Sequence, residues 1–125
     1  MKRAYYLPIA LVAIAVAVTM PLMAATQQVT LRGEVIDSVC FIKNGATGDG
    51  HRECAQTCAD SGIPLALLEE ESQELVWLAS SEMMKGANEE LKAHASHTVE
   101  ITGEWAERGG AKIFIIDSVK RISAN

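Results

Sequence analysis

All three cysteines of this chain of 125 residues fall within one short segment, together with one of its three histidines. They form the pattern C-x10-H-x2-C-x3-C, made of Cys40, His51, Cys54 and Cys58, which we call the Cys/His motif. Cysteine sulfur and neutral imidazole nitrogen are the donors that soft and borderline metal ions prefer. The motif therefore predicts a four-ligand metal site, and the fold has to bring these four side chains together.

The spacing of the motif predicts a short helix over residues 51–60. On such a helix His51, Cys54 and Cys58 lie at i, i+3 and i+7, which share one face. Asp49 is suited to cap its amino end, and Ser61-Gly62 predicts its end. Cys40 is expected at the end of the preceding strand, from where it would complete the ligand shell.

Two other readings of the cysteines stay open. An oxidising compartment would favour a structural disulfide between Cys40 and either Cys54 or Cys58, which leaves one thiol over because three cysteines cannot all pair. A redox-active pair is the second alternative, because Cys54 and Cys58 lie about one helical turn apart. Their spacing differs from the usual C-x-x-C, so the sequence favours a binding protein over an enzyme, and no catalytic residue is assigned.

The donor set does not select one ion. Four closed ligands suit structural zinc, whereas a three-coordinate site that releases His51 suits copper. We take zinc as the expected ion and copper or iron as alternatives. Haem is a weaker alternative, because the C-x-x-C-H attachment pattern is absent.

The amino terminus has the pattern of an export signal. Lys2 and Arg3 precede an uncharged stretch over residues 7–25, and Met23-Ala24-Ala25 offers small residues for cleavage. We expect residues 1–25 to be a signal peptide and residues 26–125 to be one exported, periplasmic domain. Residues 7–25 are also long enough to anchor the domain in the inner membrane.

The charge of the domain restricts its partners. The formal net charge of the chain is -5, and loss of Lys2 and Arg3 makes it two units more negative. An acidic domain without a basic face is unsuited to nucleic acid. The expected partners are a metal ion and a membrane-bound or periplasmic protein.

Alternating apolar residues predict a small barrel of five short strands, an all-β fold with helices. Gly33 and Gly103 at matched interior positions would let two strands bend sharply. A helix from about Ser81 to Ala95 is expected between the third and fourth strands, in addition to the Cys/His helix between the first two. This is the arrangement of an OB-fold. The strands are expected at 29–39, 64–68, 75–78, 98–106 and 113–122.

Several other side chains receive structural interpretations. Met84 is expected on the apolar stripe of the helix over 81–95, and Trp77 and Trp105 are expected to face the core. His94 and His97 lie near the end of the same helix and are not assigned to a site. Asp37 is either a strand-end residue or a carboxylate that orients His51.

From Val29 to Val119 the chain resembles exported bacterial OB-fold proteins. The segment Gly33-Glu-Val-Ile-Asp37, followed by the Cys/His motif, resembles one subgroup of these proteins. Members of that subgroup resemble proteins that handle metal ions or haem. The resemblance implies the OB-fold, whose first interstrand loop is a customary binding edge and here carries the whole motif. It implies no particular reaction.

Overall fold

The computed structural model describes residues 27–122, in which five strands form one sheet that closes on itself. The order around the sheet is β1-β2-β3-β5-β4, and β1 pairs antiparallel with both β2 and β4. Only β3 and β5 pair in parallel. A mostly-β fold with five strands is thereby confirmed. The strands are β1 (Val29–Asp37), β2 (Leu65–Glu69), β3 (Leu75–Ser80), β4 (Thr98–Arg108) and β5 (Ala111–Arg121).

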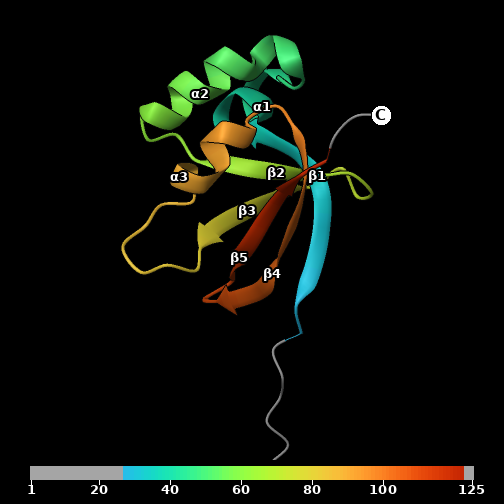
Figure 1. Cartoon of the computed structure of the whole chain (residues 1–125), viewed down its shortest axis with the longest axis vertical. Coiled ribbons are helices and arrows are strands. Elements are labelled where there is room, and N and C mark those ends of the chain that lie inside the picture. Colours follow the sequence, from blue (N-terminus) through green and yellow to red (C-terminus); the bar gives the residue numbers. More distant parts are fainter. Residues whose placement is uncertain (1–26, 123–125) are drawn as a thin grey trace, which may run out of the picture.

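Short helices fill two of the connections between strands. The connection from β1 to β2 contains α1 (Ser38–Asn44), the 3-10 turn η1 (Asp49–His51) and α2 (Arg52–Asp60). The connection from β3 to β4 contains α3 (Asn88–Leu91) and the 3-10 turn η2 (Lys92–His94). Figure 1 shows that α1, α2 and α3 gather toward one end of the closed sheet.

The core lies inside the closed sheet and is capped by side chains from the helical connections. Leu91 of α3 and Ala59 of α2 belong to it, and both are buried. Burial of this apolar surface is the main driving force for closing the sheet. The core cluster consists of Val35, Ala59, Leu65, Leu67, Val76, Leu78, Leu91, Val99, Ile101, Phe114 and Ile116.

Gly33 and Gly103 permit the close approaches that the bent sheet requires. A Cβ atom at Gly33 would lie 2.1 Å from the carbonyl oxygen of Leu68, and one at Gly103 would lie 2.0 Å from that of Ile115. Neither position has room for a side chain. Glycine is therefore needed at both positions, and the strand pairing of β4 with β5 shifts register between Thr102 and Gly103.

The predicted helix over residues 81–95 is mostly wrong. Only Asn88–Leu91 is α-helical, followed by η2, and the segment before it is an exposed loop. Met84 has a φ of 68°, which a helix does not allow, and its side chain is fully exposed rather than on a core stripe. Leu91 and Ala95 are fully buried, so the apolar positions nearest β4 were identified correctly.

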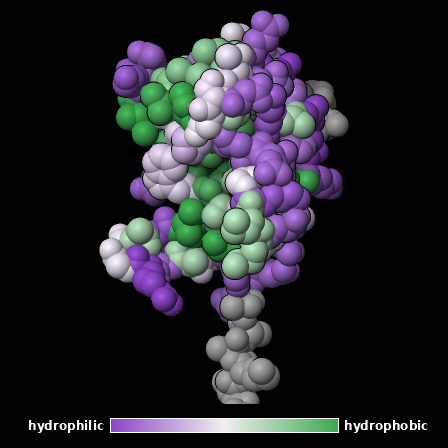
Figure 2. All heavy atoms as spheres, turned by 90° about the vertical axis from the view of Figure 1, so that its left-hand side faces the viewer, coloured by the Kyte–Doolittle hydropathy of each residue, from purple (hydrophilic) through white to green (hydrophobic). Residues whose placement is uncertain are grey.

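The two tryptophans do not face the core as expected. Trp77 is 43% exposed because its neighbours in β3, Val76 and Leu78, take the inward positions. Trp105 is 39% exposed near the end of β4, where it contacts Phe114 edge-on at 5.1 Å between ring centres. Figure 2, which faces the left side of Figure 1, shows apolar areas interspersed with hydrophilic surface.

The predicted signal peptide or anchor, residues 1–25, lies outside the described residues. Within residues 27–122, none of the helices has the length and apolar character needed to span a bilayer.

Candidate metal centre

Asp37 ends β1 and begins α1, and thereby places Cys40. Its Oδ1 accepts hydrogen bonds from the backbone amides of Val39 at 2.9 Å and Cys40 at 3.2 Å, as a helix-capping carboxylate does. Gly45 ends the helix with a φ of 66°. Cys40 therefore lies in the first turn of a helix, not at a strand end as predicted. The capping residue and the glycine are the sequence signals that could have revealed α1.

The start of α1 is fixed against the start of β2. Ser38 is buried, and both its backbone N–H and its hydroxyl donate to the carbonyl of Pro64, at 3.2 and 2.7 Å. Two hydrogen bonds to one carbonyl restrict the rotation of the helix. The direction in which Cys40 points is thus set by the sheet.

The predicted Cys/His helix is confirmed as η1 followed by α2. His51 ends η1, and Cys54 lies in the first turn of α2, one turn before Cys58. Asp49 does not cap α2 as expected, because its carboxylate pairs with the Arg52 guanidinium.

The inward face of α2 is packed and hydrogen-bonded to the rest of the chain. Ala55 and Ala59 are buried. Asn88 of α3 donates to the carbonyls of Ala59 and Ile63, at 3.2 and 2.8 Å, and accepts from the amide of Leu65. Asn88 was not identified from the sequence, where its only visible role was as a polar residue in a helix.

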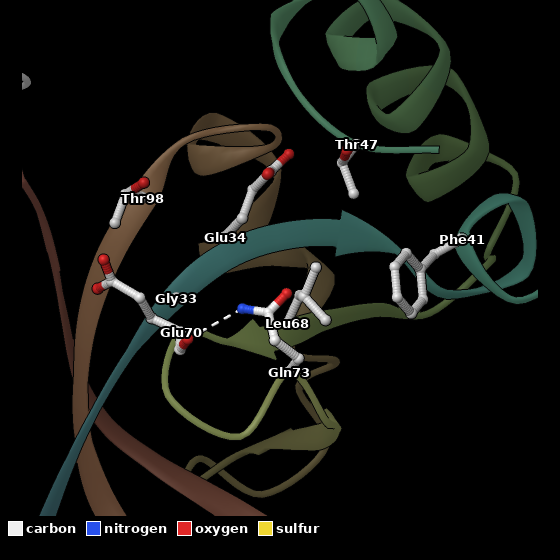
Figure 3. Close-up of a pocket in the computed structure, with 8 residues that line it drawn as sticks. All are labelled: Gly33, Glu34, Phe41, Thr47, Leu68, Glu70, Gln73 and Thr98. Atoms are coloured by element: carbon white, nitrogen blue, oxygen red, sulfur yellow. Dashed lines mark hydrogen bonds between the residues drawn. The ribbon is translucent and has the colours of Figure 1, made fainter. Parts of the chain in front are cut away.

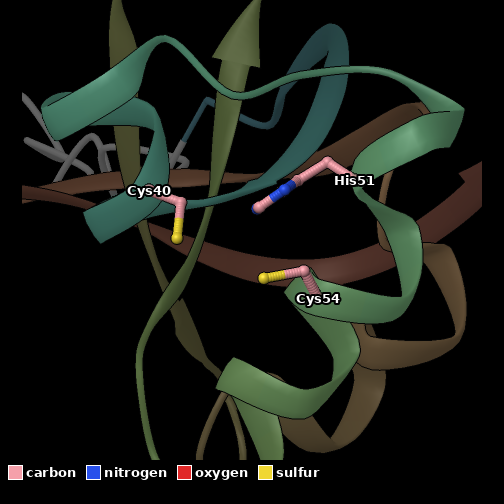
Figure 4. A group of neighbouring side chains, drawn as sticks. All are labelled: Cys40, His51 and Cys54. Carbon is pink, nitrogen blue, oxygen red and sulfur yellow. The ribbon is translucent and has the colours of Figure 1, made fainter.

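The four motif residues, predicted to form one ligand shell, instead fall into two overlapping groups of three, the second of which includes Asp37. Ligand atoms of Cys40, His51 and Cys54, the first trio, lie within 4.8 Å of one another, and Figure 4 shows these side chains pointing toward a common space. Ligand atoms of Asp37, Cys40 and Cys58, the second trio, also lie within 4.8 Å of one another. Cys40 belongs to both.

The first trio is close to the size that a metal ion requires. An equilateral triangle with edges of 4.8 Å has its centre about 2.8 Å from each corner, whereas zinc–ligand bonds are about 2.0 to 2.3 Å long. A contraction of about half an ångström would bring three donors to bonding distance. Side-chain rotation supplies such movements without a change of fold.

Two buried polar atoms at the site have no hydrogen-bond partner. They are Oδ2 of Asp37, whose side chain is fully buried, and Nε2 of His51, and the two atoms lie 4.0 Å apart. That separation is too long for a hydrogen bond. Unpaired buried polar atoms are costly, and a bound ion is one of the few partners that would satisfy both.

The carboxyl of Asp37 and the nearby thiols change one another's proton affinity. Burial raises the pKa of Asp37, but interactions with the Cys58 and Cys40 thiols and with two backbone amides outweigh it, so this pKa lies below its usual value. The interaction with Asp37, followed by desolvation, raises the pKa of Cys58 to about 12. The same carboxyl, again followed by desolvation, raises the pKa of Cys40. A metal ion would have to displace these thiol protons.

The three cysteines are free thiols in this structure. Cys54 is exposed, while Cys40 and Cys58 are partly buried. The disulfide predicted as an alternative is therefore not formed here, although the sulfurs of Cys40 and Cys54 lie within 4.8 Å.

The other two histidines lie outside both trios. The Nδ1 atom of His97 lies 3.2 Å from the Arg52 guanidinium, and burial followed by the charge of Arg121 lowers the pKa of this imidazole. His94 has a buried Nδ1 without a partner, and burial likewise lowers its pKa. The surroundings of both imidazoles therefore favour their neutral form.

A hollow beside α1 is separate from the motif. It is an open pocket of about 410 Å³, and Figure 3 shows the side chains that line it. Two of its lining residues are hydrogen-bonded, because Gln73 donates a bond of 2.9 Å to the backbone carbonyl of Glu70. None of the four motif residues lines it. The lining residues are Gly33, Glu34, Phe41, Thr47, Leu68, Glu70, Gln73 and Thr98.

Comparison with known proteins gave no relative: no protein-family model, curated protein or solved structure matched the chain. The assignment of the site consequently depends on its geometry and chemistry alone.

Proposed function

We propose that this protein is an exported metal-binding protein whose ion is held by the Cys/His motif. The observation that carries the proposal is the first trio, in which two thiols and one imidazole from α1, η1 and α2 converge within 4.8 Å. The unpaired Nε2 of His51 supports it, because this atom is buried and lacks the proton acceptor or donor that a histidine of the core would have.

Cys58 is the proposed fourth ligand of a single bound ion. It lies near Cys40 in the second trio and one helical turn from Cys54 on α2. A change of side-chain rotamer would direct its sulfur toward the first trio. The resulting Cys3His shell is tetrahedral and suits zinc, with copper as the alternative where His51 is released.

The OB-fold and the extracytoplasmic location form the second part of this proposal. Five strands in one closed sheet are what the OB-fold requires, and the helical connection between β1 and β2 occupies the edge at which such folds bind ligands. The charge pattern of residues 1–25 supports export.

The surface around the site favours exchange of the ion with a membrane-bound or periplasmic partner over a structural ion that is closed off from solvent. Cys54 is exposed, so a donor from another protein can reach an ion bound there. Val39 and Ile42 flank Cys40 on α1 and are 38% and 66% exposed. Apolar residues beside an accessible metal site suit a transient protein contact.

Substitution of Cys54 tests the function. Cys54→Ser should abolish stoichiometric zinc binding at micromolar protein, because a hydroxyl is a much poorer ligand than a thiolate. Since Cys54 is exposed, the variant should fold normally, which circular dichroism checks. His97→Ala is the matched control and should keep its zinc. Absence of bound metal in the unmodified protein, purified under reducing conditions, or equal loss in both variants, would refute the proposal.

Thiol-disulfide exchange is the second candidate, favoured by the proximity of the Cys40 and Cys54 sulfurs and by the exposure of Cys54. A thiol count on protein taken from its native compartment separates the two functions. Three thiols after removal of metal support metal binding, whereas one thiol supports the disulfide.

A further inference from the structure

The five donors at the site outnumber the ligands that one tetrahedral ion accepts. The two trios together contain three thiols, one imidazole and the carboxyl of Asp37. Zinc in a protein site takes four ligands, so one ion leaves at least one of these donors unused. The unused donor is Asp37, whose Oδ2 is fully buried and has no hydrogen-bond partner.

We propose that the site has a second metal position, formed by Asp37, Cys58 and the sulfur of Cys40, which would bridge two thiophilic divalent ions. This inference rests on the proposed function, because the first ion occupies the first trio. When the second ion binds, Cys58 leaves the first ion and joins the second. Each ion then has three protein ligands and one position that is open to water or to a donor from a partner.

The geometry of the two trios supports a shared thiolate. Both contain Cys40, and both have edges of no more than 4.8 Å. The separation of 4.0 Å between Asp37 Oδ2 and His51 Nε2 places one donor of the second position beside one donor of the first. Ions that share a ligand in protein sites lie about 3.5 to 4 Å apart, which two adjacent trios of this size accommodate.

The balance of charge supports two ions over one. Three thiolates and one carboxylate carry four negative charges, and the imidazole is neutral when it ligates a metal. One divalent ion leaves this partly buried cluster with two uncompensated negative charges, whereas two divalent ions neutralise it. Uncompensated charge in a buried site is strongly unfavourable.

Native mass spectrometry of the full-length protein with zinc in excess tests the second position. The unmodified protein should bind two zinc ions, and Asp37→Asn should bind one. Asparagine caps helices as well as aspartate does, so the variant keeps α1 while it loses the charged donor. Asp117→Asn, an exposed carboxylate of β5, is the control for charge and should bind two.

Each outcome decides between the two proposals. One zinc ion on the unmodified protein overturns the second position and leaves the single-ion site intact, whereas no zinc ion overturns both. Two ions on Asp37→Asn would show that Asp37 does not hold the second. If Asp37→Asn fails to fold, Cys58→Ser gives the answer, because it should bind one ion and would contradict the inference by binding two.

Discussion

Asp37 belongs to three parts of the molecule at once: it ends strand β1, caps helix α1 and lies in the candidate metal centre. One carboxylate oxygen caps α1 and so positions Cys40, while the other is buried and lies 4.0 Å from Nε2 of His51. From the sequence, Asp37 was either a strand-end residue or an orienting carboxylate for His51. The structure shows the first role, and the distance of 4.0 Å to His51 excludes a direct hydrogen bond in the second.

The reactivity of Cys58 in the metal-free protein tests this view of Asp37. Because the pKa of Cys58 is raised to about 12, chiefly by Asp37, almost no thiolate exists at pH 8, and alkylation by iodoacetamide should be slow and should accelerate as the pH rises toward 12. In Asp37→Asn the alkylation rate at pH 8 should rise by about tenfold for each unit by which the pKa falls. Peptide mass spectrometry measures the rate at each cysteine.

Asp60→Asn is the control for this experiment, since Asp60 lies two residues from Cys58 and its exposed carboxylate pairs with Lys92. It should leave the rate at Cys58 unchanged. An identical slow rate in both variants would show that Asp37 does not control the thiol.

At the scale of the elements, the closure of the sheet depends on two strands that bend at glycines. Gly33 in β1 lies against the backbone of β2, and Gly103 in β4 lies against the backbone of β5. Both neighbours are backbone atoms, which cannot move aside as a flexible side chain can. The sequence revealed these positions because both glycines interrupt otherwise alternating strands.

Alanine at Gly103 should destabilise the protein by about 1 to 3 kcal/mol, the range typical of overpacking in a core. Its Cβ would lie 2.0 Å from the carbonyl oxygen of Ile115, so strands β4 and β5 would have to separate. Gly86→Ala is the matched control, because nothing lies within 4 Å of its Cβ and its φ is not positive, and it should change the stability by less than about 0.5 kcal/mol. Urea denaturation measures both. Equal stability of the two variants would mean that Gly103 does not bend the sheet.

Of the helices, one could be predicted from the sequence, one was too short to be predicted, and one is shorter than its apolar spacing indicates. The segment over 51–60 was predicted correctly because its stop at Gly62 and its one-sided cysteine spacing are local signals. The seven-residue helix α1 was missed because it is too short for an apolar period to be visible. The helix over 81–95 was overextended because its apolar spacing did not reveal the exposed loop before Asn88.

At the scale of the whole molecule, the candidate site and the hydrophobic core are built from different residues. None of the four motif residues belongs to the core cluster. The motif instead occupies a helical connection that is fastened to the sheet by Pro64 and Asn88. The sequence could identify all four motif residues from their chemistry, but not their division into two trios, because that depends on the direction of each side chain.

The central claim, that the Cys/His motif binds a metal ion, is tested most directly by X-ray absorption at the zinc edge on protein loaded with one equivalent of zinc. We expect a shell of three sulfur atoms at about 2.3 Å and one nitrogen at about 2.0 to 2.1 Å. In Cys58→Ser the sulfur count should fall by one while the nitrogen stays. A shell of oxygen and nitrogen atoms only, with no sulfur, would contradict the claim.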